Sequence, residues 1–128
     1  NISLFVELPK GAFLLAIAAV IRKVVDWDTR FPMFVSDVDW CLRVVRAGYR
    51  IRFVTEVQVV HHLGKSVLPQ RARMILSSHR SFIRYFFKHY RGAKWAVPNA
   101  LVTVLLVFSG AGRYIAAKIS SKNEVASE

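Results

Sequence analysis

The segment FPMFVSDVDWCLRVVRAGYRIRFVTEVQVVHH, residues 31–62, decides how the first half of this chain folds. Apolar side chains recur in it at the spacing of one helix face: Val38, Cys41, Leu42 and Val45. This period predicts an amphipathic helix that continues to about residue 47. Ser36 is positioned to act as its N-cap, and Gly48 to end it in the left-handed conformation.

Acidic and imidazole side chains lie toward opposite ends of the same segment. Asp37 and Asp39 occupy the first turn of the predicted helix, where the helix dipole favours carboxylates even without a functional role. Alternating apolar and polar residues predict strands over 50–54 and 57–60, and the second strand ends at the pair His61-His62. We expect the acids and the histidines to meet at one edge of a sheet.

The residues before this segment predict further short elements. Residues 1–7 and 12–15 have the pattern of strands, and a helix is expected over residues 18–25. The uncharged run at 11–21 is too short to cross a bilayer, which takes about 20 residues. Cys41 is the only cysteine and cannot form an internal disulfide, so we expect it to be a small buried hydrophobe.

Charge is unevenly distributed along the chain. The 128 residues carry a net charge of +11. Residues 1–69 hold nine Lys/Arg and six Asp/Glu, whereas residues 70–128 hold ten and two. A basic partner surface is therefore expected in the second half, and any acid chemistry in the first. The length allows one domain with a modest core or part of a larger one, and because the chain begins within an apolar strand we expect a fragment.

A basic amphipathic helix is predicted over residues 71–90. Its cations fall on one stripe: Arg73, Arg80, Arg84, Lys88 and Arg91. Another side is apolar: Ile75, Phe82, Phe86 and Tyr90. Such a helix suits an anionic membrane surface, with Arg80, Arg84 and Lys88 binding lipid or acceptor phosphates. A solvated face on an ordinary packed helix is the alternative.

Residues 95–112 form an uncharged run of eighteen, close to the lower limit for a membrane span of about 20. Four residues weaken a spanning helix: Pro98, Asn99, Gly110 and Gly112. We expect a helix that lies in the cytoplasmic leaflet, and a true span is the alternative. Residues 120–128 are polar, and we expect them to be disordered.

Several motifs keep the order and spacing of a known enzyme family. They are GAFLL at 11–15, Asp28 followed by Arg30-Phe31, DVDWCLR at 37–43, AGYR at 47–50 and VVHH at 59–62, with a looser HRSFIRYFFKHY at 79–90. With these motifs the chain resembles the second half of family 2 glycosyltransferases, most closely the bacterial rhamnosyltransferase-like branch. The resemblance implies an α/β fold. Residues 1–68 would be the C-terminal half of a GT-A type glycosyltransferase domain, without its nucleotide-binding half, and residues 69–128 a helical, membrane-associating tail.

The resemblance also implies a reaction and its site residues. The reaction is inverting transfer of a sugar, with dTDP-rhamnose as the expected nucleotide-sugar donor, to a lipid-linked or cell-surface glycan. Asp37 falls at the position of the general base, and His61 near a divalent metal, Mg or Mn, held mostly by the missing half. Asp39 and Arg43 are expected to support the helix as an ion pair. The location implied is the cytoplasmic face of the bacterial inner membrane.

One departure and several alternatives stand beside this interpretation. Ser36 replaces the family's glutamate before the catalytic aspartate. The aromatic side chains Trp27, Phe34 and Trp40 either line an acceptor site or belong to the core. A non-catalytic, membrane-binding remnant of a glycosyltransferase is the alternative function. A nucleic-acid partner is not expected, because a soluble nucleic-acid binder would have to bury the long aliphatic run in the second half.

Overall fold

The computed structural model describes residues 4–9, 11–24, 27–60 and 70–126, with residues 121–126 described by their backbone only. The chain divides into two compact units, Asn1–Leu63 and Gly64–Glu128, and each unit is described by itself. The predicted boundary at residue 68 falls among residues 61–69, which lie outside the described part.

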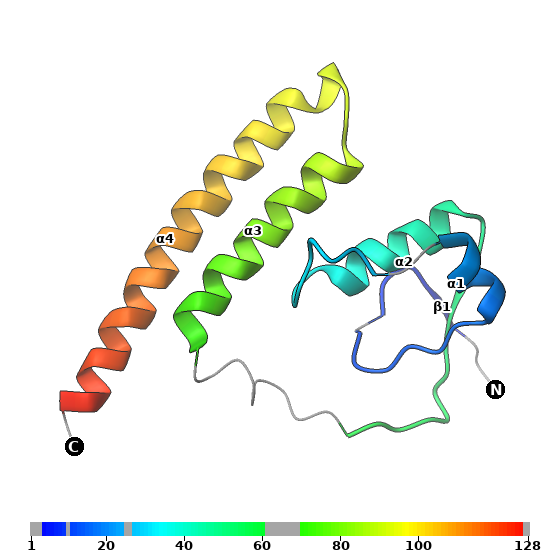
Figure 1. The fold of residues 1–128 in the computed structure, drawn as a ribbon, viewed down its shortest axis with the longest axis horizontal. Helices are drawn as coiled ribbons and strands as arrows, with labels where there is room; N and C mark the ends of the chain where they lie inside the picture. Colours follow the sequence, from blue (N-terminus) through cyan, green and yellow to red (C-terminus); the bar gives the residue numbers. More distant parts are fainter. Residues whose placement is uncertain (1–3, 10, 25–26, 61–69, 127–128) are drawn as a thin grey trace. The chain divides into compact units, whose positions relative to one another are not determined.

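Two strands and two helices make up the described part of the first unit (Figure 1). In chain order they are β1 (Leu4–Val6), α1 (Ala18–Val24), α2 (Ser36–Arg46) and β2 (Ile51–Phe53). β1 and β2 form an antiparallel pair in which Val6 lies opposite Ile51. Both helices and both of these strands agree with the sequence predictions. The GT-A assignment of this unit stays a prediction.

Two other predicted strands, at residues 12–15 and 57–60, are wrong, because neither segment is a strand in the structure. Among the described residues neither has a pairing partner, since β1 and β2 pair only with each other. Their apolar side chains are largely exposed, with Leu15 at 91% and Val60 at 84%. The apolar runs at 12–15 and 57–60 therefore predicted strands, but neither run pairs with another strand among the described residues.

The core of the first unit lies between α1 and α2. Its buried side chains are Val20, Val24, Trp40, Cys41 and Val44. These positions recur at helical spacing on each helix, so one apolar stripe of each packs against the other. Cys41 is fully buried, which confirms its predicted place in the core.

Both ends of α2 are determined by backbone conformation. Val35 is the N-cap and has a left-handed φ of 69°, with no side-chain capping bond, so the prediction that Ser36 is the N-cap is wrong. A β-branched residue with positive φ costs about 1–2 kcal/mol. The predicted stop at Gly48 is confirmed. Gly48 has a φ of 88° and donates its N–H to Val45, while Tyr49 donates to Val44, which is the Schellman pattern.

A helical hairpin makes up the described part of the second unit. It consists of α3 (Arg71–His89), the short 3-10 helix η2 (Ala93–Trp95) and α4 (Ala96–Ala126). α3 and α4 run side by side in opposite directions (Figure 1). The predicted helix at 71–90 is confirmed. The predicted disorder at 120–126 is wrong, because α4 continues to Ala126 and no proline or glycine after Gly112 interrupts it.

Polar contacts fix the register of the hairpin. The Nδ1 of His79 lies 2.7 Å from the carbonyl oxygen of Ile75, so Nδ1–H donates and Nε2 faces the hydroxyl of Ser109 at 3.5 Å. A Cβ at Gly110 would lie 3.1 Å from the same imidazole ring. At the other end of the hairpin, Asn99 donates to the carbonyl oxygen of Tyr90 at 2.8 Å. The helices therefore approach closely through small and polar residues.

The side of α4 that faces away from α3 is apolar and exposed. It carries Val97, Leu101, Leu105, Phe108, Ile115 and Ile119, which are between 56% and 74% exposed. We call these six residues the outer face of α4. In the part of the chain that the structure describes, residues 93–120 form one helical segment whose length and composition suffice to cross a membrane, and 6% of its most apolar window is buried. A core helix of a soluble protein would be mostly buried.

Candidate functional site at the start of α2

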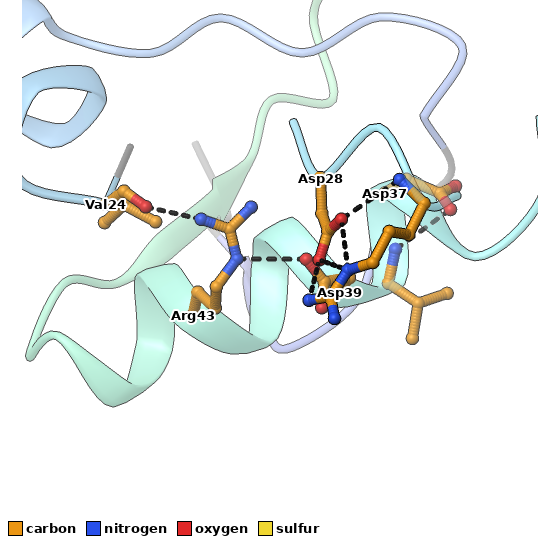
Figure 2. A network of polar contacts seen from close by, with 7 residues as sticks. Val24, Asp28, Asp37, Asp39 and Arg43 are labelled. Carbon is orange, nitrogen blue, oxygen red and sulfur yellow. Dashed lines mark hydrogen bonds and ion pairs between the residues drawn. The ribbon is translucent and has the colours of Figure 1, made fainter. Parts of the chain in front are cut away.

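Asp37 lies in the first turn of α2 and is partly exposed. Its Oδ2 accepts a hydrogen bond of 3.0 Å from the backbone N–H of Gly11, and its Oδ1 accepts one of 2.9 Å from the N–H of Val38 (Figure 2). The two backbone donors hold the carboxylate in a fixed orientation. Each oxygen keeps a further lone pair for another donor.

Gly11 is in unusually close contact with this aspartate. A Cβ built at Gly11 would lie 2.8 Å from the Cβ of Asp37 and 2.9 Å from its Oδ2. No larger residue fits there unless the carboxylate moves. Gly11 begins the GAFLL motif, but the sequence interpretation gave it no role. The only sequence signal for this contact was a glycine at the start of an apolar run.

Asp39 has a different environment from Asp37, although they are two residues apart. Its side chain is fully buried and accepts a hydrogen bond of 3.0 Å from the Nε of Arg43, which confirms the predicted ion pair. A second nitrogen of Arg43 donates to the carbonyl oxygen of Val24, the last residue of α1. Helix ends leave such carbonyls without an intrahelical partner. The pair therefore joins the end of α1 to the start of α2.

A third acidic side chain, Asp28, lies near this network (Figure 2). It forms a forked ion pair with Arg30, whose Nη2 lies 2.6 Å from Oδ2 and whose Nε lies 2.9 Å from Oδ1. The hydrogen bond to Asp28 and its charge raise the pKa of Arg30, and burial opposes the shift. Asp28 is thus paired with a residue of its own loop, two positions along the chain.

Cys41 lies one helical turn after Asp37 on the buried side of α2. Burial raises the pKa of its thiol, and the negative charge of Asp37 raises it further. The thiol is therefore neutral at physiological pH, which suits a core residue and disfavours a nucleophile.

The three aromatic residues weighed as an acceptor platform are in different environments. Trp40 belongs to the buried core, so the core alternative holds for it. Trp27 stacks on Trp40 with ring centroids 5.6 Å apart and stays 46% exposed. Phe34 is half-buried. Of the three, Trp27 presents the most surface to an acceptor.

The predicted metal residue, His61, and its neighbour His62 lie outside the described residues. Within the described ranges, no group of three or more His, Cys, Asp and Glu side chains is placed to hold a metal. The described residues do not form a divalent metal site by themselves, and the metal stays a prediction.

The predicted phosphate-binding residues lie on α3 in the second unit. Arg80 and Arg84 are exposed and Lys88 is half-buried. Two apolar side chains that the sequence interpretation did not place on this stripe, Leu76 and Phe87, are also exposed, at 37% and 53%. Helical spacing puts them among the arginines, which could have been read from the sequence.

Comparison with known proteins finds no matching family model, no similar curated protein and no similar solved structure. The glycosyltransferase resemblance therefore depends on the quoted sequence motifs.

Proposed function

We propose that this chain supplies the acceptor side of a membrane-attached, inverting glycosyltransferase, with Asp37 as the general base. Asp37 takes the proton of an acceptor hydroxyl as the hydroxyl oxygen bonds to the anomeric carbon of the sugar. The bond from that carbon to the nucleotide diphosphate breaks, and the diphosphate leaves with the electron pair. The expected donor is dTDP-rhamnose, and the acceptor is a lipid-linked or cell-surface glycan.

The contrast between two carboxylates carries the proposal. Asp39 is buried and paired with Arg43, so it has a structural role. Asp37 is partly exposed and bonded to two backbone N–H groups, and among the described residues it has no cationic partner. A general base must be oriented and within reach of its substrate. Of the two aspartates, only Asp37 combines a fixed orientation with partial exposure.

Donor binding and the divalent metal are assigned to groups outside the described residues. When bound, a divalent metal would neutralise the charge that develops on the departing diphosphate. The described residues contribute the proton acceptor and its orientation. The α3–α4 hairpin contributes attachment to the cytoplasmic face of the membrane, where a lipid-linked acceptor would be found.

A transfer assay tests this function. Membranes that contain the full-length gene product are incubated with radiolabelled dTDP-rhamnose and lipid extract, and label in the lipid and polymer fractions is counted. The proposal predicts transfer that exceeds that of membranes without the protein. A panel of other nucleotide sugars identifies the donor if rhamnose is not transferred. Absence of transfer from every donor contradicts the enzyme proposal.

A second candidate, a non-catalytic membrane-binding module, is favoured by the exposed outer face of α4 and by Ser36 in place of the family's glutamate. Under this alternative the protein binds membranes but transfers no sugar. The two candidates separate in the same preparation, because attachment is measured in the membrane pellet and transfer in the label.

A further inference from the structure

We infer that the α3–α4 hairpin lies flat in one leaflet of an anionic bilayer, with α4 embedded and α3 above it at the level of the lipid phosphates. The orientation rests on the membrane attachment contained in the proposed function and is independent of sugar transfer. It assigns a lipid-facing surface to named residues and excludes a spanning hairpin.

The six residues of the outer face lie along one side of α4 and do not form a continuous stretch of sequence. They extend from Val97 to Ile119, which corresponds to about 33 Å of helix. Two exposed cations occur within that length, and helical spacing puts Lys118 beside the face and Arg113 on the opposite side of the helix. An apolar face with the cations kept off it is typical of a helix in the plane of the interface.

α3 presents an exposed stripe in which arginines alternate with apolar side chains. The stripe consists of Arg73, Leu76, Arg80, Arg84 and Phe87, all exposed and spaced by three or four residues. We call it the outer stripe of α3. From a helix at the level of the headgroups, arginine side chains reach the lipid phosphates. The charge and pattern of the stripe therefore fit an anionic lipid surface.

The register of the hairpin excludes a span of both helices together. His79 faces Ser109 near one end, and Tyr90 is bonded to Asn99 near the other. Arg84 lies about midway between these contacts, so it runs alongside the middle of the uncharged residues 95–112, and Arg80, next to His79, runs alongside their second half. If that run crossed the bilayer, Arg84 would enter its centre and Arg80 would enter the bilayer with it. Each arginine there disfavours insertion roughly a hundredfold.

The flat orientation places each helix at a suitable depth. The side of α4 that faces α3 carries Ser109 and Asn99, which contact His79 and Tyr90. The outer face of α4 therefore points away from α3. Packed helices lie about 8–10 Å apart, and interfacial helices bury their apolar face about 5–10 Å into the boundary. With α4 at the acyl boundary, α3 therefore lies among the headgroups. One anionic leaflet therefore contacts both the outer face of α4 and the arginines of the outer stripe of α3.

Flotation with phosphatidylcholine vesicles, with and without phosphatidylserine, tests the lipid surface. The double variant Arg73→Glu with Arg80→Glu should lower partitioning into anionic vesicles at least about tenfold. Its control, Arg22→Glu with Arg52→Glu, changes the same net charge on exposed residues of the first unit and should alter partitioning less than about threefold. Equal losses, or release by competing DNA, overturn the proposal. Asp37→Asn should partition like the unmodified chain, which separates this result from the fate of the proposed enzyme.

Labelling with a membrane-impermeant maleimide tests the orientation. Single cysteines replace Lys94 and Ser120, which are exposed near the two ends of α4, and the unmodified chain with its buried Cys41 is the blank. In bacterial cells, a flat hairpin leaves both positions unlabelled in intact spheroplasts and labelled in inside-out vesicles. Labelling of one position from each side shows a span and overturns the proposal. A cross-linked dimer through α4 without lipid attachment also overturns it.

Discussion

The backbone N–H of Gly11 donates a hydrogen bond of 3.0 Å to the Oδ2 of Asp37, and the two residues are 26 positions apart in the chain. The contact brings the start of the GAFLL motif against the start of α2. It also fixes the carboxylate that we propose as the base, so Gly11 is a positioning residue rather than a catalytic one.

Substitution of Gly11 by alanine should move this carboxylate. The added Cβ would meet Asp37 at 2.8–2.9 Å, so the side chain has to rotate or the loop has to shift. Overpacking of this kind costs about 1–3 kcal/mol of unfolding free energy, measured by chemical denaturation. Sugar transfer should fall at least about tenfold, because a displaced base loses its orientation. The control is Gly112→Ala, where nothing lies within 4 Å of the new Cβ, and it should fold and transfer normally.

Two aspartates that form ion pairs should differ in their contribution to stability. Asp39→Asn leaves the guanidinium of Arg43 facing a fully buried neutral side chain, and should cost about 3 kcal/mol of unfolding free energy. Asp28→Asn breaks a pair whose arginine side chain is 62% exposed, and should cost less than about 1 kcal/mol. Urea titrations of both variants measure the difference. Equal effects would show that the buried pair does not hold α1 to α2.

The thiol of Cys41 should make stability depend on pH at the alkaline end. Its folded pKa is raised above 9.0, so between the unfolded and folded pKa values the unfolded chain releases a proton that the folded chain keeps. Stability is therefore complete below the unfolded pKa and falls as the pH rises above it. Cys41→Ala removes this contribution, so the difference in unfolding free energy between the two chains should narrow as the pH rises. A constant difference would contradict the raised pKa.

Close approach of α3 and α4 should depend on the glycine opposite His79. Gly110→Val would press against the imidazole ring, which is already 3.1 Å from an ideal Cβ, and should separate the helices there. Limited proteolysis should then cleave the η2 connection faster. Partitioning into vesicles should also change, because the two helices have separated. Gly112→Val serves as the control, because open space surrounds that position. Identical proteolysis of both variants would mean that the His79 contact does not hold the hairpin.

The helices were predictable from sequence because their signals are local. The period of the apolar residues predicted the α2 helix, and Gly48 predicted its end. The predicted apolar stripe was wrong in detail, because Trp40, Cys41 and Val44 are the buried residues of α2 in the core, whereas Val45 is exposed. The Asp39–Arg43 pair followed from a four-residue spacing. The start of α2 was not predictable in the same way, because Val35 adopts a left-handed conformation that β-branched residues rarely take.

The strands and the contacts around the proposed base were less predictable, because they depend on distant segments. A short apolar run such as residues 57–60 becomes a strand only where another strand pairs with it, and among the described residues none does. The bond from Gly11 to Asp37 uses a backbone donor, which no side-chain pattern reveals. The arginine stripe of α3 was visible in the sequence, but its position beside the middle of residues 95–112 required the contacts of His79 and Asn99.

Single-turnover sugar transfer by Asp37→Asn tests the central claim most directly. The matched control is Glu56→Gln, an exposed acid whose side chain contacts the neighbouring Thr55. With folding of both variants verified by circular dichroism, the chemical step of Asp37→Asn should slow by about 10²–10⁴-fold, while Glu56→Gln keeps the unmodified rate. A rate for Asp37→Asn within about threefold of the control would show that this carboxylate does not take the acceptor's proton.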